Sequence, residues 1–324
     1  MTPTVRLADG VSIETGRTIV CDARSATGDV TVVTHAHADH ARRSDEEPVL
    51  CSPLTARLMA ARSGPAVEAA SSAPGIELHP SGHIPGSRAV LIQGDRRVLY
   101  TGDVSTRDRG PQTGFEPVDA DVLIVEATYG RPAYRFPPQA TIESSIRDFI
   151  ADTAAPLVLY GYSLGRAQTL QRLARAATAR RLVVHPTVAA ANAAIEAGTD
   201  RSFPAVSWAE LDRLAADDVV VAPTGARRGN WFARELERLE PVTAAFSGWA
   251  VSDRYRHRLG VDAAFVISDH CDFPELVELV RAVDPDRVYT HHGFAGDFAA
   301  HLTSEHGYDA VALRRRQHRL EEYA

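Results

Sequence analysis

The segment from Thr34 to His40 constrains the fold more than any other part of the chain. It reads Thr-His-Ala-His-Ala-Asp-His and directly follows the run Val-Thr-Val-Val, which is typical of a buried β-strand. Three imidazoles so close together would repel one another as cations, and the imidazoles and the carboxylate would be costly to bury unpaired. A shared metal ion removes both problems, because neutral imidazole and carboxylate are zinc ligands. The segment therefore predicts a metal site where a strand ends in a loop.

The side chains of this segment divide into two groups. His35 and His37 alternate along an extended chain and can point the same way, while Asp39 and His40 turn toward a second metal position. One segment does not complete two coordination shells, so further ligands are expected at other strand ends. Such places carry the motifs Ser-Gly-His, Thr-Gly-Asp and Thr-His-His-Gly, and their candidate ligands are His83, Asp103, His291 and His292.

The composition is that of an ordinary globular chain. Its 324 residues are 44% hydrophobic and 24% charged, which is enough for a sizeable core. The net charge of −7 and the pI of about 6.0 exclude a basic nucleic-acid-binding protein as judged by bulk charge, and all 35 basic residues are arginine. There are three cysteines, no CxxC motif and no apolar run long enough to span a membrane. We therefore expect a soluble cytoplasmic protein without disulfides.

The order of the predicted elements indicates an α/β protein of two lobes. Short β-rich runs separated by Gly, Pro and Asp dominate the first 126 residues. Farther along the chain, strands alternate with amphipathic helices, which is typical of a parallel α/β layer. The helices are expected at 53–62, 140–151, 165–178, 230–239, 274–283 and 296–305.

The metal motifs, in their order and at their intervals, resemble the metallo-β-lactamase fold superfamily. The resemblance implies an αββα sandwich that holds two Zn²⁺ ions, with Mn²⁺ or another divalent metal as the alternative. It assigns His35, His37 and His83 to one ion, Asp39, His40 and a late His to the other, and Asp103 to both. The late ligand usually stands directly before Gly, which favours His292; the doubled His leaves His291 open.

Three further motifs resemble the β-CASP branch of this superfamily, which comprises nucleases of nucleic acid. They are Glu126 at a strand end, the triplet Ser268-Asp269-His270, and His292 before Gly293. The resemblance implies an inserted α/β lobe, with the first part of the metallo-β-lactamase domain at 1–127, the β-CASP lobe at 128–245 and the second part at 246–324. Longer segments resemble ligase-associated DNA exonucleases and archaeal messenger-RNA 3′-end processing factors.

The activity that the resemblance implies is hydrolysis of phosphodiester bonds by a hydroxide held between two zinc ions. We expect an exonuclease that acts on DNA or RNA, on a single strand or an end, with a functional link to DNA ligase. In this interpretation Asp39 orients the hydroxide and His270 is the general acid, while Glu126 and Asp269 hold its ring. The motifs do not separate DNA from RNA or exonuclease from endonuclease action, and they say nothing of the oligomeric state.

Other residues near the motifs are candidates for contact with a nucleic acid. Arginines bind phosphate through bidentate hydrogen bonds, and aromatic rings stack on bases. The candidates are Arg131, Arg135 and Arg166 for phosphate and Tyr129, Tyr134, Phe136 and Trp249 for bases.

Three alternative functions are open at this point. Ser163 lies in Gly-Tyr-Ser-Leu-Gly between a strand and a helix, as in a serine hydrolase whose acid and base would be Asp269 and His292. That hypothesis leaves the His-rich segment unexplained. A small-molecule metallo-hydrolase of the same fold is the second alternative, although such enzymes lack the long insert. A non-catalytic subunit of an RNA-processing complex is the third, although such subunits usually lose ligands.

Overall fold

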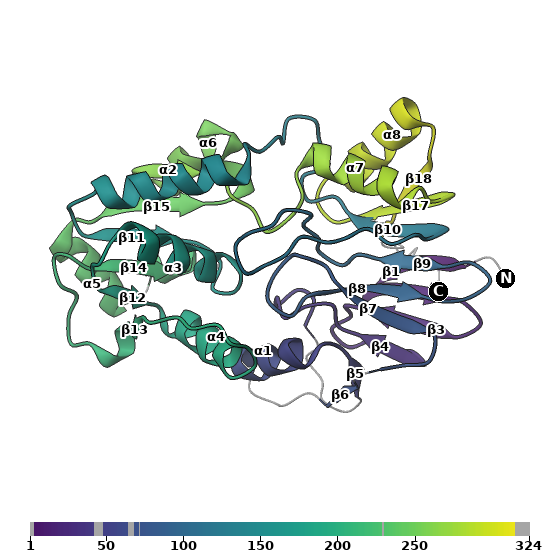
Figure 1. The fold of residues 1–324 in the computed structure, drawn as a ribbon, viewed down its shortest axis with the longest axis horizontal. Helices are drawn as coiled ribbons and strands as arrows, with labels where there is room; N and C mark the ends of the chain where they lie inside the picture. Colours follow the sequence, from purple (N-terminus) through teal and green to yellow (C-terminus); the bar gives the residue numbers. More distant parts are fainter. Residues whose placement is uncertain (1–2, 42–47, 64–67, 71, 229, 315–324) are drawn as a thin grey trace, which may run out of the picture. The chain divides into compact units, whose positions relative to one another are not determined.

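The structure is a computed structural model that describes residues 3–41, 48–63, 68–70, 72–228 and 230–314. Its internal contacts divide the chain into two compact units (Figure 1). Unit 1 consists of Met1–Thr106, Gly114–Pro132 and Phe273–Ala324, and unit 2 of Arg107–Thr113 and Ala133–Asp272. The assignment of 128–245 as an inserted domain stays a prediction.

Unit 1 contains two six-stranded sheets. The first has the order β1 (Thr4–Ala8), β2 (Gly10–Glu14), β3 (Thr18–Cys21), β4 (Val30–Val32), β5 (Val49–Leu50), β6 (Ala69–Ala70). The second has the order β18 (Asp309–Ala312), β17 (Arg287–His291), β10 (Val122–Glu126), β9 (Val98–Tyr100), β8 (Arg88–Ile92), β7 (Ile76–Pro80).

The two sheets of unit 1 share one hydrophobic core. Val11 and Ile13 are buried in β2 while their neighbours are only half-buried, which is the alternation of a strand with one covered face. These side chains belong to the same cluster as Val90 of β8 and Ile124 of β10. In Figure 1, α7 (Phe273–Val283) and α8 (Ala295–His306) lie against the second sheet, and unit 1 also contains α1 (Pro53–Ser63).

Unit 2 is built on a six-stranded parallel sheet. Its order is β13 (Val206–Ser207), β12 (Leu182–Val184), β14 (Val219–Ala222), β11 (Leu157–Tyr160), β15 (Val242–Phe246), β16 (Ala263–Phe265). Unit 2 also contains α2 (Gln139–Asp152), which precedes β11, and α3 (Arg166–Ala177), α4 (Pro186–Glu196), α5 (Asn230–Leu239) and α6 (Asp253–Leu259), which lie between its strands in the sequence. Short 3-10 helices cover Trp208–Glu210, Thr224–Arg228 and Gly248–Val251.

Successive residues of the central strand β11 belong to two different cores. Leu157 and Leu159 cluster with the buried side chains of α2 and α3, whereas Val158 and Tyr160 cluster with Phe232 of α5. Because helices cover both faces of the sheet, its strands are continuously apolar instead of alternating.

The predicted α/β class and all six predicted helices are confirmed, with ends within three residues. Helices α4 and α6 and the hairpin of β1 and β2 were not predicted. In α4, Pro186 occupies the first turn and the His185 side chain caps it, while Val188, Ala191 and Ile195 are buried, so a local signal was present. None of the described helices combines the length and the apolar character that a membrane crossing needs.

Candidate metal centre

The strand order of unit 1 gathers the predicted ligands at one edge of the second sheet. Strands β9, β10 and β17 are parallel neighbours, so their carboxyl ends lie together. Asp103 follows β9, Glu126 ends β10 and His292 follows β17. The segment that begins at Thr34 joins this edge from the first sheet, where Arg88 N–H donates to the Thr34 carbonyl at 2.9 Å.

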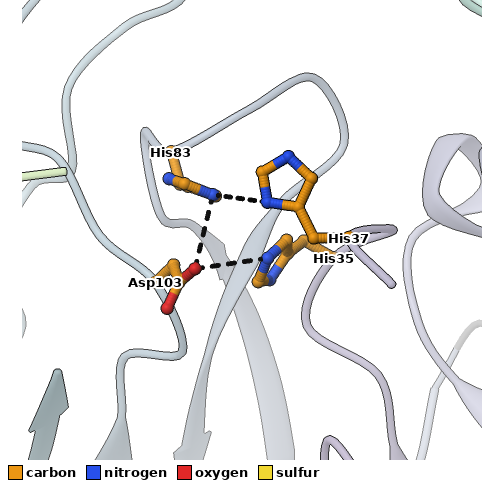
Figure 2. Close-up of side chains that lie close together, drawn as sticks. All are labelled: His35, His37, His83 and Asp103. Carbon is orange, nitrogen blue, oxygen red and sulfur yellow. Dashed lines mark hydrogen bonds and ion pairs between the residues drawn. The ribbon is translucent and has the colours of Figure 1, made fainter. Parts of the chain in front are cut away.

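Four predicted ligands form one group. His35, His37, His83 and Asp103 each offer a ligand atom, and these atoms lie within 4.8 Å of one another. Figure 2 shows the imidazoles of His35 and His83 directed at the Asp103 carboxylate, with Nε2 to Oδ2 distances of 3.4 and 3.5 Å. Nε2 of His83 also lies 3.1 Å from Nδ1 of His37.

Hydrogen bonds fix the orientation of the His35 ring. The Thr34 hydroxyl donates to Oδ2 of Asp22 at 2.7 Å, because a carboxylate only accepts. Its oxygen is then free to accept from Nδ1–H of His35 at 3.0 Å. In this tautomer, Nε2 of His35 carries the lone pair and faces Asp103, as a metal ligand requires.

A second group of ligands surrounds His40. Its Nε2 lies 3.6 Å from Oδ2 of Asp103 and 3.9 Å from Oδ2 of Asp39. His40, Asp103 and His292 offer ligand atoms within 4.8 Å of one another. Nδ1 of His40 donates to Asp22 at 2.9 Å, so this ring is also oriented by a carboxylate behind it.

The electrostatics of this second group favour a cation. Burial by itself would lower the pKa of His40, but the carboxylates of Asp103, Asp22 and Asp39 outweigh it and raise the pKa to about 10. By contrast, burial and the nearby His40 lower the pKa of His35. A metal ion bound to Nε2 of His40 would take the place of the proton that these carboxylates favour.

The donor atoms of the cluster fit a metal ion. Nε2 of His35 is buried and makes no hydrogen bond with the described residues, although Asp103 lies 3.4 Å away. A buried polar atom without a hydrogen bond is costly, and coordination would satisfy it. Three imidazoles and a carboxylate also form a donor set that suits Zn²⁺. The cluster can therefore hold a metal ion.

The geometry separates the two neighbouring histidines after β17. His292 has φ of +58°, and this left-handed conformation turns its side chain to His40 and Asp103. His291 is buried, and its ring stacks on Tyr100 with 5.4 Å between centroids. Neither ring nitrogen of His291 has a hydrogen-bond partner among the described residues. Among the described residues, it is His292 and not His291 whose ligand atom lies within 4.8 Å of those of His40 and Asp103, and this proximity favours His292 as the ligand.

Glu126 lies beside the cluster as a fully buried carboxylate. Its Oε1 accepts from the Val104 amide and its Oε2 from the Thr128 amide, both at 3.1 Å. It also lies within 4.8 Å of the Asp103 carboxylate. The two amide hydrogen bonds offset the cost of burying a second carboxylate there.

The remaining predicted catalytic residues, Asp269 and His270, belong to unit 2. The buried Asp269 accepts from Arg109 at 2.5 Å and from Arg166 at 3.0 Å. Burial would raise the pKa of Asp269, but Arg166 and Arg109 lower it. The amide of His270, which is half-buried, donates to the Ser268 hydroxyl at 3.0 Å.

The predicted substrate contacts need a correction. Arg166 is 2% exposed and paired with Asp269, so its guanidinium does not reach a phosphate. Tyr129 is 3% exposed, so its ring does not reach a base. Both side chains are buried instead of lying on the surface. The rings of Tyr134 and Trp249 contact each other edge to face, with 5.2 Å between centroids.

Other candidates for substrate contact are already engaged or exposed. Arg131 donates to Asp297 at 2.6 Å, and Arg135 is exposed. The Phe136 ring lies 5.5 Å from the Arg107 guanidinium carbon.

The residues of the serine-hydrolase alternative are engaged in other contacts. In unit 2, the Ser163 hydroxyl bonds to the Thr187 hydroxyl at 3.0 Å. The acid of the serine-hydrolase alternative, Asp269, is engaged by arginines.

Sequence reasoning missed the residues that orient the ligands. Asp22 accepts from the Thr34 amide, the Thr34 hydroxyl, Nδ1 of His40 and the Tyr100 hydroxyl, all at 2.7–2.9 Å. The available signal was an Asp directly after the apolar run Thr-Ile-Val-Cys, at the end of β3. A single Asp at a strand end does not reveal which imidazole it orients.

Comparisons with known proteins found relatives whose names refer to nucleic acids. A protein named probable DNA ligase from Opitutus terrae is 35% identical over 297 residues, which cover 87% of this chain and 28% of that relative. A protein named probable RNase MJ4 from Methanocaldococcus jannaschii is 25% identical over 287 residues, which cover 72% of this chain and 66% of that relative. The chain thus spans less than two thirds of these relatives. No family model matches the chain.

A solved structure matches the fold along the whole chain. It is a crystal structure of a protein of unknown function from Enterococcus faecalis, with a TM-score of 0.61 and 12% identity, and it covers 97% of both chains. The two packed sheets and the His/Asp cluster define a metallo-β-lactamase fold with a metal site. With its relatives, the chain belongs to the β-CASP nuclease family of that fold, whose members depend on metal ions. The fold class and the family expected from the motifs are confirmed.

Proposed function

We propose that this chain is a zinc-dependent nuclease that hydrolyses phosphodiester bonds of DNA or RNA. One observation carries most of the support. Nε2 atoms of His35, His40 and His83 all lie 3.4–3.6 Å from a single oxygen, Oδ2 of Asp103. A carboxylate shared by two groups of imidazoles suits two neighbouring metal ions, as in hydrolases that act on phosphate esters.

The proposed ligands follow the two groups of donors. His35, His37 and His83 would hold the first ion, Asp39, His40 and His292 would hold the second, and Asp103 would be available to both. Imidazole-rich donors suit zinc better than manganese or magnesium. When bound, two such ions neutralise negative charge on the phosphate and lower the pKa of water.

Side chains of the protein orient the attacking water and supply the proton to the leaving oxygen. Asp39 is exposed and carries a carboxylate that can orient the attacking water. His270 donates a proton to the leaving oxygen, because an imidazole can act as a general acid. Glu126 fixes the strand end by its two amide hydrogen bonds, and Asp269 fixes the loop of His270 through Arg109 and Arg166.

The cellular role that we propose is exonuclease action in DNA repair or RNA processing, in the cytoplasm. Support for DNA repair comes from the relative named probable DNA ligase, and support for RNA processing from the relative named RNase. A functional link to a DNA ligase is part of the proposal. Residues 128–245 form the inserted lobe in this proposal, and the chain works without a membrane.

A cleavage assay tests the proposed function. Single- and double-stranded DNA and RNA, labelled at either end, are incubated with the protein with and without a chelator and added zinc. His35→Ala should abolish cleavage, whereas His79→Ala should not. His79 is a matched control because it belongs to the same unit and pairs with Glu77 at 3.5 Å, outside the cluster.

The alternatives give different results in the same assay. Failure to cleave any of the four substrates while zinc still binds would favour a small-molecule hydrolase. Failure to cleave together with failure to bind zinc would favour a non-catalytic subunit. Cleavage that survives the chelator and stops in Ser163→Ala would favour the serine hydrolase.

A further inference from the structure

A short segment of unit 2, Arg107–Thr113, contacts the loop that carries His270. In the sequence the segment comes soon after Asp103, and the chain on either side of it, Met1–Thr106 and Gly114–Pro132, belongs to unit 1. The segment itself belongs to unit 2 because its contacts are made there. No function proposed so far explains why the chain makes this excursion.

The loop of residues 268–272 presents a single side chain. His270 is half-buried, whereas the other four residues of the loop are buried. The amide of His270 also donates to the Ser268 hydroxyl at 3.0 Å. The neighbours on both sides of His270 therefore anchor the backbone and decide where its imidazole lies.

On the amino-terminal side of His270, the segment binds the Asp269 carboxylate. Each carboxylate oxygen accepts from a different arginine, Oδ1 from Arg109 at 2.5 Å and Oδ2 from Arg166 at 3.0 Å. Arg166 also donates to the Phe246 carbonyl at 2.7 Å, which ties this group to the end of β15. A carboxylate held at both oxygens does not rotate freely, so this side of the loop is fixed.

On the carboxyl-terminal side of the loop, the same segment binds Asp272. Oδ2 of Asp272 accepts from Nη2 of Arg107 at 3.1 Å and from the Phe136 amide at 2.7 Å. Arg107 also donates to the Pro137 carbonyl at 2.8 Å. The side chains of Arg107 and Asp272 are only 14% and 4% exposed, so breaking this pair should cost more than breaking a surface pair.

The backbone of the segment forms a tight turn. Arg109 and Gln112 exchange backbone hydrogen bonds at 2.8 and 3.4 Å. Gly110 has φ of +65°, a conformation that favours glycine. Arg201 donates to the Pro111 carbonyl at 2.5 Å. The turn therefore gives the arginines that contact the loop a fixed base.

We propose that the segment Arg107–Thr113 holds His270 where it donates its proton, and that Arg107 is a further positioning residue. The inference rests on the proposed nuclease function. In that reaction the oxygen of water bonds to phosphorus and the P–O bond to the leaving sugar breaks. The water loses one proton to the medium, while His270 passes one to the sugar oxygen and regains it from the medium. Misplacing a catalytic group by about 1 Å can cost about 100-fold in rate, so a residue that acts only through the loop can control this step.

The test varies the need for a proton on the leaving group. It uses a single-stranded oligonucleotide of DNA or RNA, whichever wild type cleaves faster, and the same oligonucleotide with sulfur in place of the leaving oxygen. The sulfur is placed on the 3′ or the 5′ side of the phosphate, according to the bond that wild type breaks. A thiolate leaves without a proton, whereas a sugar oxygen needs one. KM and kcat are measured with added zinc for wild type, Arg107→Ala, Arg107→Lys, His270→Ala and Arg181→Ala.

Arg181 is the matched control for Arg107. It pairs with the buried Asp218 of unit 2 at 2.7 Å. It directly precedes β12, whereas the loop of His270 follows β16, so the two pairs lie at opposite edges of the parallel sheet. Arg181→Ala should therefore match wild type on both substrates.

We expect Arg107→Ala to lower kcat about 10- to 100-fold more on the oxygen substrate than on the sulfur substrate, with little change in KM. His270→Ala should show the same difference, and Arg107→Lys should restore part of the rate. Urea unfolding shows whether each variant folds. If Arg107→Ala does not fold, Asp272→Asn tests the same contact, because it keeps the size of the buried side chain.

Two results contradict different claims. Equal losses on the two substrates in a folded variant, or no loss on either, overturn this inference alone. A wild type that cleaves neither DNA nor RNA contradicts the proposed function, and the inference falls with it.

Discussion

Asp22 in unit 1 and Asp269 in unit 2 are both buried carboxylates with lowered pKa values, but different donors stabilise them. Burial would raise the pKa of Asp22, and His40 lowers it; burial would raise the pKa of Asp269, and Arg166 and Arg109 lower it. Asp22 also accepts from two hydroxyls and an amide. The two hydroxyls and the amide are neutral, so they leave the charge of Asp22 available to orient the His40 ring, whereas two arginines, which are permanent cations, neutralise the charge of Asp269. We therefore infer that Asp22 prepares a binding site, whereas Asp269 fixes a loop.

The largest effect on activity is expected when a metal ligand near Asp22 is replaced. His292→Ala should lower the zinc content from about two ions per chain to about one and abolish cleavage, because it removes a ligand of the second ion. His291→Phe should keep both ions, because a phenyl ring can retain the stack on Tyr100. Metal analysis by mass spectrometry checks both variants. The reverse pattern would make His291 the ligand.

A large loss of stability is expected when Asp269 is replaced. Asp269→Ala removes the carboxylate that pairs with the buried Arg109 and Arg166, so the free energy of unfolding should fall by about 3–5 kcal/mol. The control Asp297→Ala breaks an exposed ion pair with Arg131 and should cost less than about 1 kcal/mol. Urea unfolding measures both values. Similar losses in the two variants would show that the buried arginines do not depend on Asp269.

Removal of the charge of Asp22 should affect metal binding more than folding. Asp22→Asn keeps the size of the side chain but weakens its hold on Nδ1 of His40, so zinc affinity should fall by about 10- to 100-fold. Tyr100→Phe removes one donor to the same carboxylate and should have a smaller effect. Competition with a chelating dye gives both affinities. Unchanged affinity in Asp22→Asn would refute its orienting role.

The smallest effect is a pH dependence at Asp9. Partial burial would raise its pKa, but the Ser25 hydroxyl and three backbone amides lower it to about 2. The folded pKa lies below the unfolded value, so the stabilisation is fully present above about pH 4 and is lost as the pH falls toward 2. The difference in unfolding free energy between wild type and Asp9→Asn should shrink over this interval. A constant difference would contradict the lowered pKa.

The same contrast explains what the sequence allowed us to predict. The ligands in the segment from Thr34 to His40 are close in the chain, and β-strand alternation relates their directions. The residues that hold the orienting carboxylates are distant in the sequence. The Tyr100 hydroxyl donates to Asp22 from 78 residues away, and Arg109 donates to Asp269 from 160 residues away. Contacts at such separations depend on the packing of strands, which no local pattern encodes.

The fold was also predictable only in part. Strand and helix alternation in unit 2 predicted a parallel sheet, because strands covered on both faces are continuously apolar. The strand order β13-β12-β14-β11-β15-β16 was not predictable, since Leu157 and Val219 pair across the sheet while equally apolar alternatives exist.

The most direct test is the recovery of cleavage as zinc is added to chelator-stripped protein. Wild type should be inactive when stripped and should regain cleavage of DNA or RNA as about two ions bind per chain. Asp103→Asn should remain inactive at the same zinc concentrations, because it removes the carboxylate that both groups of ligands share. Cleavage by stripped wild type, or full recovery in Asp103→Asn, would contradict a metal-dependent nuclease centred on Asp103.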